Sequence, residues 1–287
     1  MSVDVATLSD AVEAKHRALV ELLRSYGRVV VAYSGGVDSA FLARVACDAL
    51  GERAIALTAR SPSLMQVELE DAKALAVAIG IEHRVVTTHE LDRPDYVKNE
   101  TSRCYYCKTE LFDTTQLAAE TFEGAVVVDG FNTDDLADFR PGHRAAAEHD
   151  VRHPLAEVGL SKAEIRALSK RLGLPTWDKP QLACLSSRLP YGVAVTEERL
   201  GRVERVEVCL RELGFFDVRA RLVRDNDDMV RIEVGEAEIE GVVRHRARIV
   251  ADAQAAGFGF VTLDLEGFRT GRLNEGLVQL GVRPKTN

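Results

Sequence analysis

The chain has 287 residues, of which 46% are hydrophobic and 29% are charged, a composition typical of a soluble globular protein with two domains. Its net charge of −8 is unfavourable for general binding to nucleic acid, so we expect no nucleic-acid partner. Five cysteines, an odd number in a long acidic chain, do not indicate a disulfide framework. Without a secretory leader or an apolar run of bilayer length, the sequence predicts a protein of the reducing cytoplasm with no membrane partner.

The first elements are a predicted helix, a buried strand and a second helix. Residues 8–26 carry apolar side chains at helical spacing. Residues 29–33 (VVVAY) form an apolar run of strand length, and residues 40–46 (AFLARVA) continue as a helix. Residues 34–39, SGGVDS, connect the two, so a tight glycine turn joins the end of the strand to the start of the helix.

This glycine turn has the features of a phosphate-binding loop. It aims backbone N–H groups and a helix N-terminus at one point, and glycine leaves room for phosphate oxygens and permits positive φ values. The lysine of a Walker A loop is absent, so the cradle is of another kind. The hexapeptide resembles the PP-loop of the ATP pyrophosphatases, which cleave ATP to AMP and pyrophosphate while they adenylate a substrate. The alternative is a glycine turn in an ordinary α/β domain.

Strands and helices alternate in the following segment. The predicted strands are 53–58, 82–87 and 125–129, and the predicted helices are 66–80, which ends at Gly80, and 105–121. This alternation predicts an α/β fold with a parallel sheet covered by helices on both faces. Ligands of such sheets bind at the carboxyl ends of the strands, where the SGGVDS turn lies.

A capped helix and an irregular segment come next. Residues 161–173 predict a helix, and Ser161 and Glu164 have the spacing of a capping box at its start. The breakers that follow are Pro175, Pro180, Pro190 and Gly192. Their density predicts a functional loop or a domain boundary.

The pattern beyond this segment indicates a smaller α+β unit. Its predicted elements are helices 197–214 and 236–256 and strands 217–223, 229–234 and 258–264. We therefore predict a PP-loop (adenine nucleotide alpha hydrolase-like) domain over residues 1–190. Residues 191–287 are predicted to form a C-terminal α+β domain for substrate binding or oligomerisation, and we expect a homo-oligomer.

Three of the cysteines are candidates for the chemistry. Cys104 and Cys107 share a face if they lie on the first turn of a helix, where the helix N-terminus and flanking basic residues favour thiolate. Cys184 lies in the irregular segment. Cys47 and Cys209 lie on helices and are interpreted as packing residues.

Three thiols leave several kinds of site open. A CxxC pair can be a redox dithiol or half of a structural zinc site, although zinc usually takes four protein ligands. Three thiolates also fit a 4Fe–4S cluster in which one iron has no protein ligand, and that iron can hold an extra sulfide. A sulfur donor beside an ATP site indicates adenylation of a substrate followed by thiolation.

Three further segments give a more specific resemblance. They are residues 130–142 (GFNTDDLADFRPG), 177–192 (WDKPQLACLSSRLPYG) and 264–271 (DLEGFRTG). Together with SGGVDS they resemble the LarE family, the ATP-dependent sulfur transferases that help to make the nickel-pincer nucleotide cofactor of lactate racemase. The resemblance covers nearly the whole chain. It implies that the substrate is pyridinium-3,5-biscarboxylic acid mononucleotide, a small-molecule nucleotide whose carboxylates become thiocarboxylates.

The resemblance also implies roles for individual residues. The residues that it assigns to the pyrophosphate cradle are Ser34, Gly35, Gly36, Asp38 and Ser39. Thr58 would lie near the adenine. Cys184 matches the family's sulfur-bearing cysteine, which in some members gives up its own sulfur. Members with an added CxxC are implied to hold a 4Fe–4S cluster, so we expect a cluster on Cys104, Cys107 and Cys184, with ATP and Mg²⁺ completing the set of cofactors.

Charged residues are the candidates for contacts with the nucleotides. Guanidinium groups suit bidentate contact with phosphate, and the candidates for the substrate phosphate are Arg188, Arg219 and Arg269. The candidate metal or ribose contacts are Asp134, Asp135 and Asp138. A solvated acidic loop is the alternative for these aspartates.

Other functions stay open. Some tRNA thiolation enzymes of the same superfamily also combine a PP-loop with a CxxC and a distant cysteine, but the acidic charge and the lack of a recognisable RNA-binding extension oppose this function. NAD and GMP synthetases share SGGVDS, yet amide synthesis needs no cysteine triad. A nucleotide-binding module without turnover would need no thiols. Within sulfur transfer, the alternative to a cluster is sacrificial, single-turnover donation from Cys184.

Overall fold

The structure, a computed structural model, describes residues 9–137, 142–180, 183–224 and 226–269, and the chain divides into two units. Unit 1 contains Met1–Tyr96 and Ser102–Leu182, and unit 2 contains Val97–Thr101 and Ala183–Asn287. The chain therefore enters unit 2 briefly and returns to unit 1 before it crosses over again. The predicted boundary after residue 190 falls within unit 2.

Unit 1 is built on a parallel sheet, as predicted. Among the described residues its strands are β1 (Val29–Ala32), β2 (Ala54–Arg60), β3 (Glu82–Thr87) and β4 (Val126–Val128), paired in parallel in the order β3-β2-β1-β4. Its helices are α1 (Asp10–Tyr26), α2 (Val37–Leu50), η1 (Gly51–Arg53), α3 (Gln66–Ile79), η2 (Glu90–Asp92), α4 (Pro94–Val97, which runs into unit 2), α5 (Arg103–Thr121), η3 (Thr133–Ala137), α6 (Gly142–Glu148), α7 (Pro154–Glu157) and α8 (Lys162–Arg171). Strand β1 lies between β2 and β4, so the SGGVDS turn leaves the sheet from a central strand.

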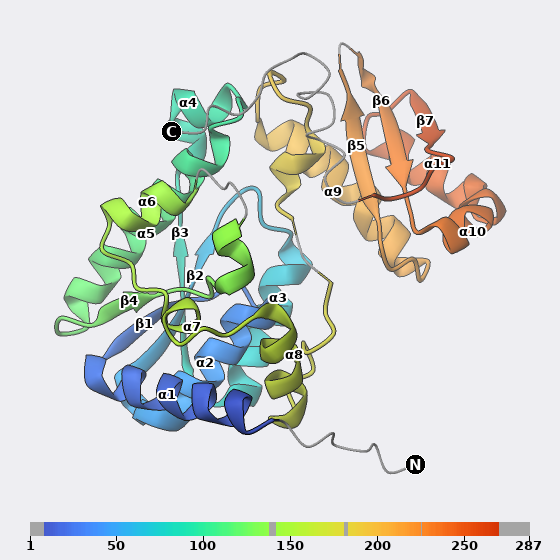
Figure 1. The fold of residues 1–287 in the computed structure, drawn as a ribbon. Coiled ribbons are helices and arrows are strands. Elements are labelled where there is room, and N and C mark those ends of the chain that lie inside the picture. The colour runs from blue at the N-terminus through green and yellow to red at the C-terminus, as the bar shows by residue number, and fades with distance from the viewer. Residues whose placement is uncertain (1–8, 138–141, 181–182, 225, 270–287) are drawn as a thin grey trace. The chain divides into compact units, whose positions relative to one another are not determined.

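Helices cover both faces of this sheet (Figure 1). Val29 and Val31 of β1 belong to a buried cluster with residues of α1, α2, α3 and α8, whereas Val30 belongs to a second cluster with residues of α5 and α6. Successive residues of a strand point to opposite faces, so the continuous apolar run of β1 is what a sheet covered on both sides requires. The predicted α/β fold is confirmed.

Two predicted helix ends are confirmed in detail. Gly80 follows α3 in the left-handed conformation, with φ 83° and ψ 19°, which glycine adopts without a steric penalty. At the start of α8, the hydroxyl of Ser161 accepts a bond from the N–H of Glu164, and the Glu164 carboxylate accepts one from the N–H of Ser161. This capping box fixes the point at which α8 begins.

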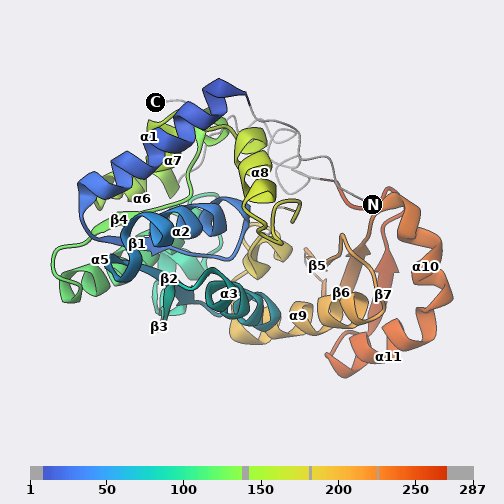
Figure 2. The same ribbon diagram turned by 90° about the horizontal axis from the view of Figure 1, so that it is seen from below.

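Unit 2 is a smaller α+β unit (Figure 2). Its strands β5 (Arg219–Val223), β6 (Asn226–Glu233) and β7 (Phe260–Leu263) form a sheet in the order β5-β6-β7, with β5 antiparallel and β7 parallel to β6. Its helices include η4 (Leu185–Arg188), α9 (Glu197–Glu212) and α11 (Arg246–Ala255). Helix α9 contacts β5 and α11, and α11 contacts β7, so the two helices pack side by side on the sheet.

The predicted single helix over residues 236–256 is wrong. The structure has η5 (Glu236–Glu238), α10 (Ile239–Arg244) and α11 there, with the break at His245. Neither glycine nor proline marks this position, and the ring of His245 packs edge-on against Phe215, 6.1 Å between centroids, so a tertiary contact accompanies the break. In the part of the chain that the structure describes, no helix is long and apolar enough to cross a membrane.

The segment Val97–Thr101 is bound into unit 2 chiefly through Asn99. This residue is fully buried and has a φ of 55°. Its side-chain amide donates to the carbonyls of Pro190 and Val193, each at 2.9 Å, and its own carbonyl accepts a bond from the N–H of Gly192 at 2.9 Å. These bonds hold the turn that follows the Cys184 loop.

Candidate functional site

The SGGVDS turn closes on itself through two hydroxyl groups. The Ser39 Oγ accepts a bond from the N–H of Ser34 at 3.2 Å and lies 3.1 Å from the Ser34 Oγ. Gly35 has a φ of +70°, and a Cβ added there would lie 2.9 Å from the Cβ of Ala72. Both the conformation and the space therefore require glycine at this position.

The turn presents the N-terminus of α2. Gly36 is the N-cap residue, and among the described residues no side chain caps this helix. The first N–H groups of a helix are donors without intrahelical partners and lie at the positive end of the helix dipole. The geometry can therefore accept a phosphate group. Binding of pyrophosphate by these residues stays a prediction.

Asp38 has one satisfied and one unsatisfied carboxylate oxygen. Its Oδ2 pairs with the Nζ of Lys162, the first residue of α8, and its Oδ1 is buried without a hydrogen-bond partner in the described structure. Burial raises the pKa of the Asp38 carboxyl, although the Lys162 ammonium opposes that shift. A buried carboxylate oxygen beside a phosphate cradle fits a hard divalent cation such as Mg²⁺, which takes oxygen ligands.

Gly130 lies tightly against the first turn of α2. A Cβ added at Gly130 would lie 2.9 Å from the backbone nitrogen of Ser39 and 3.1 Å from the Cβ of Asp38. The loop after β4 and the phosphate cradle are therefore in close contact, and glycine makes this approach possible.

We expect Gly130→Ala to weaken ATP binding about tenfold. Overpacking costs about 1–3 kcal/mol, and a cost of about 1.4 kcal/mol at the cradle corresponds to a tenfold weaker complex. The dissociation constant, measured by titration calorimetry, checks this. Gly201→Ala in α9 is the control because nothing lies within 4 Å of a Cβ added there. Equal ATP affinity in both variants would show that the contact at Gly130 does not shape the cradle.

Thr58 connects the ends of two strands. It is 3% exposed, and its hydroxyl donates to the carbonyl of Tyr33 at 2.7 Å and lies 2.8 Å from the Nε2 of His83. The hydroxyl thus holds the end of β1 against β2 and β3. The adenine contact expected for Thr58 is untested, and the hydrogen bonds show that the residue shapes this edge of the sheet.

The aspartates after β4 hold their own loop. The Oδ2 of Asp134 accepts a bond from the N–H of Lys162 at 2.8 Å, and the Oδ2 of Asp135 accepts one from the N–H of Asn132 at 3.2 Å. Asp138 lies outside the described residues. The contacts of Asp134 join this loop to the start of α8.

The CxxC pair lies on the first turn of a helix, as expected. Cys104 and Cys107 follow Arg103, the first residue of α5. Cys104 is exposed, Cys107 is half-buried, and neither forms a disulfide. Both belong to unit 1.

Cys184 belongs to unit 2 and is exposed as a free thiol at the N-cap of η4. Within the described residues, no group of three or more His, Cys, Asp and Glu side chains is arranged to hold a metal ion. The donor set itself, three thiols outside disulfides of which two are exposed to solvent, is chemically suited to an iron–sulfur cluster. The other two cysteines differ, because burial raises the pKa of Cys47 and raises that of Cys209 to about 12.

Arg188 supports the loop that carries Cys184. Its guanidinium is 1% exposed and forms a bidentate pair with the fully buried carboxylate of Glu207, at 2.7 and 2.9 Å. Its Nη1 donates to the carbonyls of Ala183 and Cys184, at 2.8 and 3.3 Å. These contacts hold the backbone on which the Cys184 thiol sits. Sequence reasoning missed Glu207, whose charge does not stand out in the polar helix α9.

Arg219 is a buried cation with few hydrogen-bond partners. It donates to the carbonyl of Val218 at 2.7 Å, and its guanidinium lies 4.6 Å from the centre of the Phe268 ring. Burial lowers the pKa of Arg219 to about 10, and the charge of Arg188 acts in the same direction. A bound anion would relieve both effects, so Arg219 is well suited to a phosphate group.

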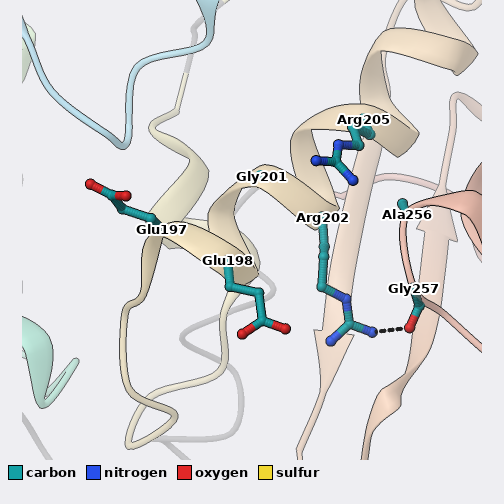
Figure 3. Close-up of a pocket in the computed structure, with 7 residues that line it drawn as sticks. All are labelled: Glu197, Glu198, Gly201, Arg202, Arg205, Ala256 and Gly257. Carbon is teal, nitrogen blue, oxygen red and sulfur yellow. Dashed lines mark hydrogen bonds between the residues drawn. The ribbon is translucent and has the colours of Figure 1, made fainter.

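Unit 2 also contains Arg269 and a surface groove. Arg269 is partly exposed and pairs with Glu266 at 2.8 Å. A shallow groove of about 280 Å³ lies along α9. In it, the guanidinium of Arg202 donates to the carbonyl of Gly257 at 2.7 Å, and Glu197 points away from it (Figure 3). The groove combines opposite charges without a nucleophile, and we assign it no chemistry.

Comparison with known proteins identifies relatives of the whole chain. The family model for NAD synthase matches residues 12–104, which contain the SGGVDS turn. The chain is 48% identical to the uncharacterized protein slr1717 of Synechocystis sp., over 93% of this chain and 99% of the relative. It is 37% identical to the pyridinium-3,5-bisthiocarboxylic acid mononucleotide synthase of Lactiplantibacillus plantarum, over 92% of this chain and 95% of that enzyme. The tRNA-specific 2-thiouridylase MnmA of Azorhizobium caulinodans is 29% identical over 53% of this chain and 49% of its own length.

Proposed function

Because this chain belongs to the LarE family of sulfur-inserting synthases, we propose that it is an ATP-dependent sulfur transferase that converts pyridinium-3,5-biscarboxylic acid mononucleotide to its thiocarboxylate form. The observation that carries the proposal is that one chain combines an uncapped helix N-terminus at a phosphate cradle with three thiols that form no disulfide. The cradle suits ATP, and exposed thiols suit the acceptance and transfer of sulfur.

The first half of the reaction makes a carboxylate reactive. A carboxylate is a poor electrophile, so its oxygen first forms a bond to the α-phosphorus of ATP and pyrophosphate leaves. The cradle at Ser34–Ser39 binds the departing phosphates through the N-terminus of α2, and Asp38 offers its buried oxygen to Mg²⁺. When bound, Mg²⁺ neutralises phosphate charge. Thr58 borders the adenine side of the cradle.

The second half replaces AMP by sulfur. In this proposal Arg219 and Arg269 bind the phosphate of the substrate, since a bidentate guanidinium is suited to it. Arg188 was predicted to bind that phosphate as well, but its contacts with Glu207 and the loop carbonyls favour a positioning role for the Cys184 loop. The thiols of Cys104, Cys107 and Cys184 would hold a 4Fe–4S cluster, and such a cluster would supply the sulfide that replaces AMP.

Anaerobic reconstitution with iron and sulfide tests the cluster. We expect about four irons per chain in the wild type and loss of that iron in Cys104→Ala, because each cluster of this kind needs its thiolate ligands. Bound iron and the visible spectrum are measured together. Cys47→Ala is the control, since Cys47 is half-buried on α2 and bonds to the carbonyl of Ile79. Iron content that is unchanged in Cys104→Ala would contradict the three-cysteine assignment.

Sacrificial donation from Cys184 is the second candidate within the same function. The exposure of Cys184 allows its thiol to act directly. In that case the wild type forms product without iron, and mass spectrometry after turnover detects the loss of one H₂S from the peptide that contains Cys184. Thiolation of tRNA is less well supported, because the similarity to MnmA covers about half of each chain.

A further inference from the structure

The SGGVDS turn contains no lysine, yet a lysine reaches it from another part of the chain. The ammonium of Lys162 pairs with the Oδ2 of Asp38, the fifth residue of the turn, across 124 positions of sequence. Both residues belong to unit 1. The contact arises because α8 begins beside the turn from which α2 begins.

The position of Lys162 is fixed by its surroundings. Its backbone N–H donates to the Oδ2 of Asp134 at 2.8 Å, and the capping box of Ser161 and Glu164 surrounds it in sequence. Glu164 also forms an ion pair with Lys15 at 2.7 Å. The start of α8 is thus held by α1 and by the loop after β4, and the lysine side chain extends from a fixed point.

The placement of this lysine is unfavourable for α8 itself. A cation in the first turn opposes the helix dipole, and Lys162 is the first residue of α8. Its partner Asp38 is only half satisfied, since the Oδ1 of Asp38 is buried without a hydrogen-bond partner among the described residues. Locally unfavourable features of this kind are typical of functional sites. Here the cation at the start of α8 and the buried Oδ1 without a partner belong to the same ion pair.

We infer that Lys162 is the lysine of this phosphate cradle: its ammonium moves from Asp38 to the β- and γ-phosphoryl oxygens of ATP and stabilises pyrophosphate as it leaves. This inference rests on the proposed function. The flexible four-carbon stem of lysine allows the move without a shift of the helix. When Lys162 leaves Asp38, both carboxylate oxygens of Asp38 become available to Mg²⁺. The same movement therefore gives the phosphates a cation and Mg²⁺ a ligand.

The chemical step explains why a cation is needed at this place. An oxygen of the substrate carboxylate forms a bond to the α-phosphorus, and the bond between that phosphorus and the α,β-bridging oxygen breaks. The electron pair of the broken bond stays on pyrophosphate, so negative charge accumulates on the group that Lys162 contacts. Preorganised cations directed at developing charge are among the largest contributions to catalysis.

Ligands that differ in their phosphates test the inference. Lys162→Met keeps the length of the side chain and removes its charge. We expect ATP and pyrophosphate to bind about tenfold or more weakly to this variant and AMP, which lacks the β- and γ-phosphates, to bind within about twofold of wild type. Titration calorimetry measures all three dissociation constants. The rate of AMP formation falls about 100-fold, and Lys162→Arg recovers part of it.

The controls separate this role from a structural one. Lys73→Met, which removes a lysine whose partner is Glu70 on α3, leaves all three dissociation constants unchanged. An equal loss of affinity for AMP and ATP, or no loss for either, would overturn the inference. If Lys162→Met does not fold, as judged by its thermal transition, Lys162→Gln is compared in the same way. Wild-type protein that binds ATP but releases no pyrophosphate with the dicarboxylate would contradict the proposed function, while the binding comparison would still decide the role of Lys162.

Discussion

Replacement of Cys184 by alanine is expected to abolish sulfur transfer while adenylation of the substrate, with release of pyrophosphate, continues. Cys184 is an exposed thiol in the η4 loop of unit 2, whereas the phosphate cradle is built from β1 and α2 of unit 1. Under the proposed function, the variant therefore lacks the sulfur-bearing group and keeps the residues proposed to bind ATP. We expect thiocarboxylate formation to fall about 10³-fold or more, as for other lost nucleophilic groups.

Two parallel assays measure this effect. A pyrophosphate assay follows adenylation, and mass spectrometry of the pyridinium product follows the exchange of oxygen for sulfur. Cys47→Ala serves as the matched control and retains both activities. Thiolation by Cys184→Ala at the wild-type rate would remove this residue from the mechanism, and loss of pyrophosphate release in the same variant would show that Cys184 acts before sulfur transfer.

Glu207→Ala is expected to destabilise the protein by about 3–5 kcal/mol, because it leaves the buried guanidinium of Arg188 without its counter-charge. Arg188 is 1% exposed and Glu207 is fully buried. One carboxylate oxygen of Glu207 also accepts a bond from the N–H of Ala220 at 2.9 Å, so the substitution breaks several interactions at once. Urea denaturation, monitored by circular dichroism, measures the change in the free energy of unfolding.

A double variant distinguishes two roles of the Arg188–Glu207 pair: stabilising the fold and positioning the Cys184 loop. Replacement of a whole buried ion pair by apolar residues is often neutral for stability, so Arg188→Met with Glu207→Leu should recover most of the lost stability. The rate of sulfur transfer should remain below that of the wild type, because the double variant lacks the bonds from Arg188 to the carbonyls of Ala183 and Cys184. Glu21→Ala, at an exposed pair with Arg24, is the surface control. A Glu207→Ala variant as stable as this control would contradict the prediction.

Most of the fold follows from local sequence patterns. The apolar run of β1, the glycine turn and the capping box at Ser161 each specify an element through interactions within a few residues, and the structure has all of them. The helix predicted over residues 236–256 failed for the opposite reason. Its break at His245 coincides with packing against Phe215, a partner that no local pattern reveals.

In the candidate site, too, local sequence patterns identify some residues, whereas contacts between distant segments could not be predicted. Sequence motifs identify the turn and the CxxC pair because each is contiguous or closely spaced, and Cys184 because it lies in a distinctive irregular segment. The ion pairs of Arg188 with Glu207 and of Lys162 with Asp38 join segments that meet only in the folded chain. The phosphate contact predicted for Arg188 stays a prediction, and its buried pair with Glu207 could not be predicted because the sequence does not show which residue an arginine will meet.

The short excursion of the chain around Asn99 constrains the order in which the protein can fold during synthesis. The side-chain amide of Asn99 donates to the carbonyl of Leu189. The ribosome adds Leu189 only 90 positions after Asn99. Until that later segment has been synthesised, Asn99 cannot be buried in unit 2. The segment that precedes α5 lacks the hydrogen bonds of Asn99 during this time. We therefore expect a fragment that starts at Ala183 to be a poor contiguous cassette for the C-terminal unit, because it lacks Val97–Thr101 and the hydrogen bonds of Asn99.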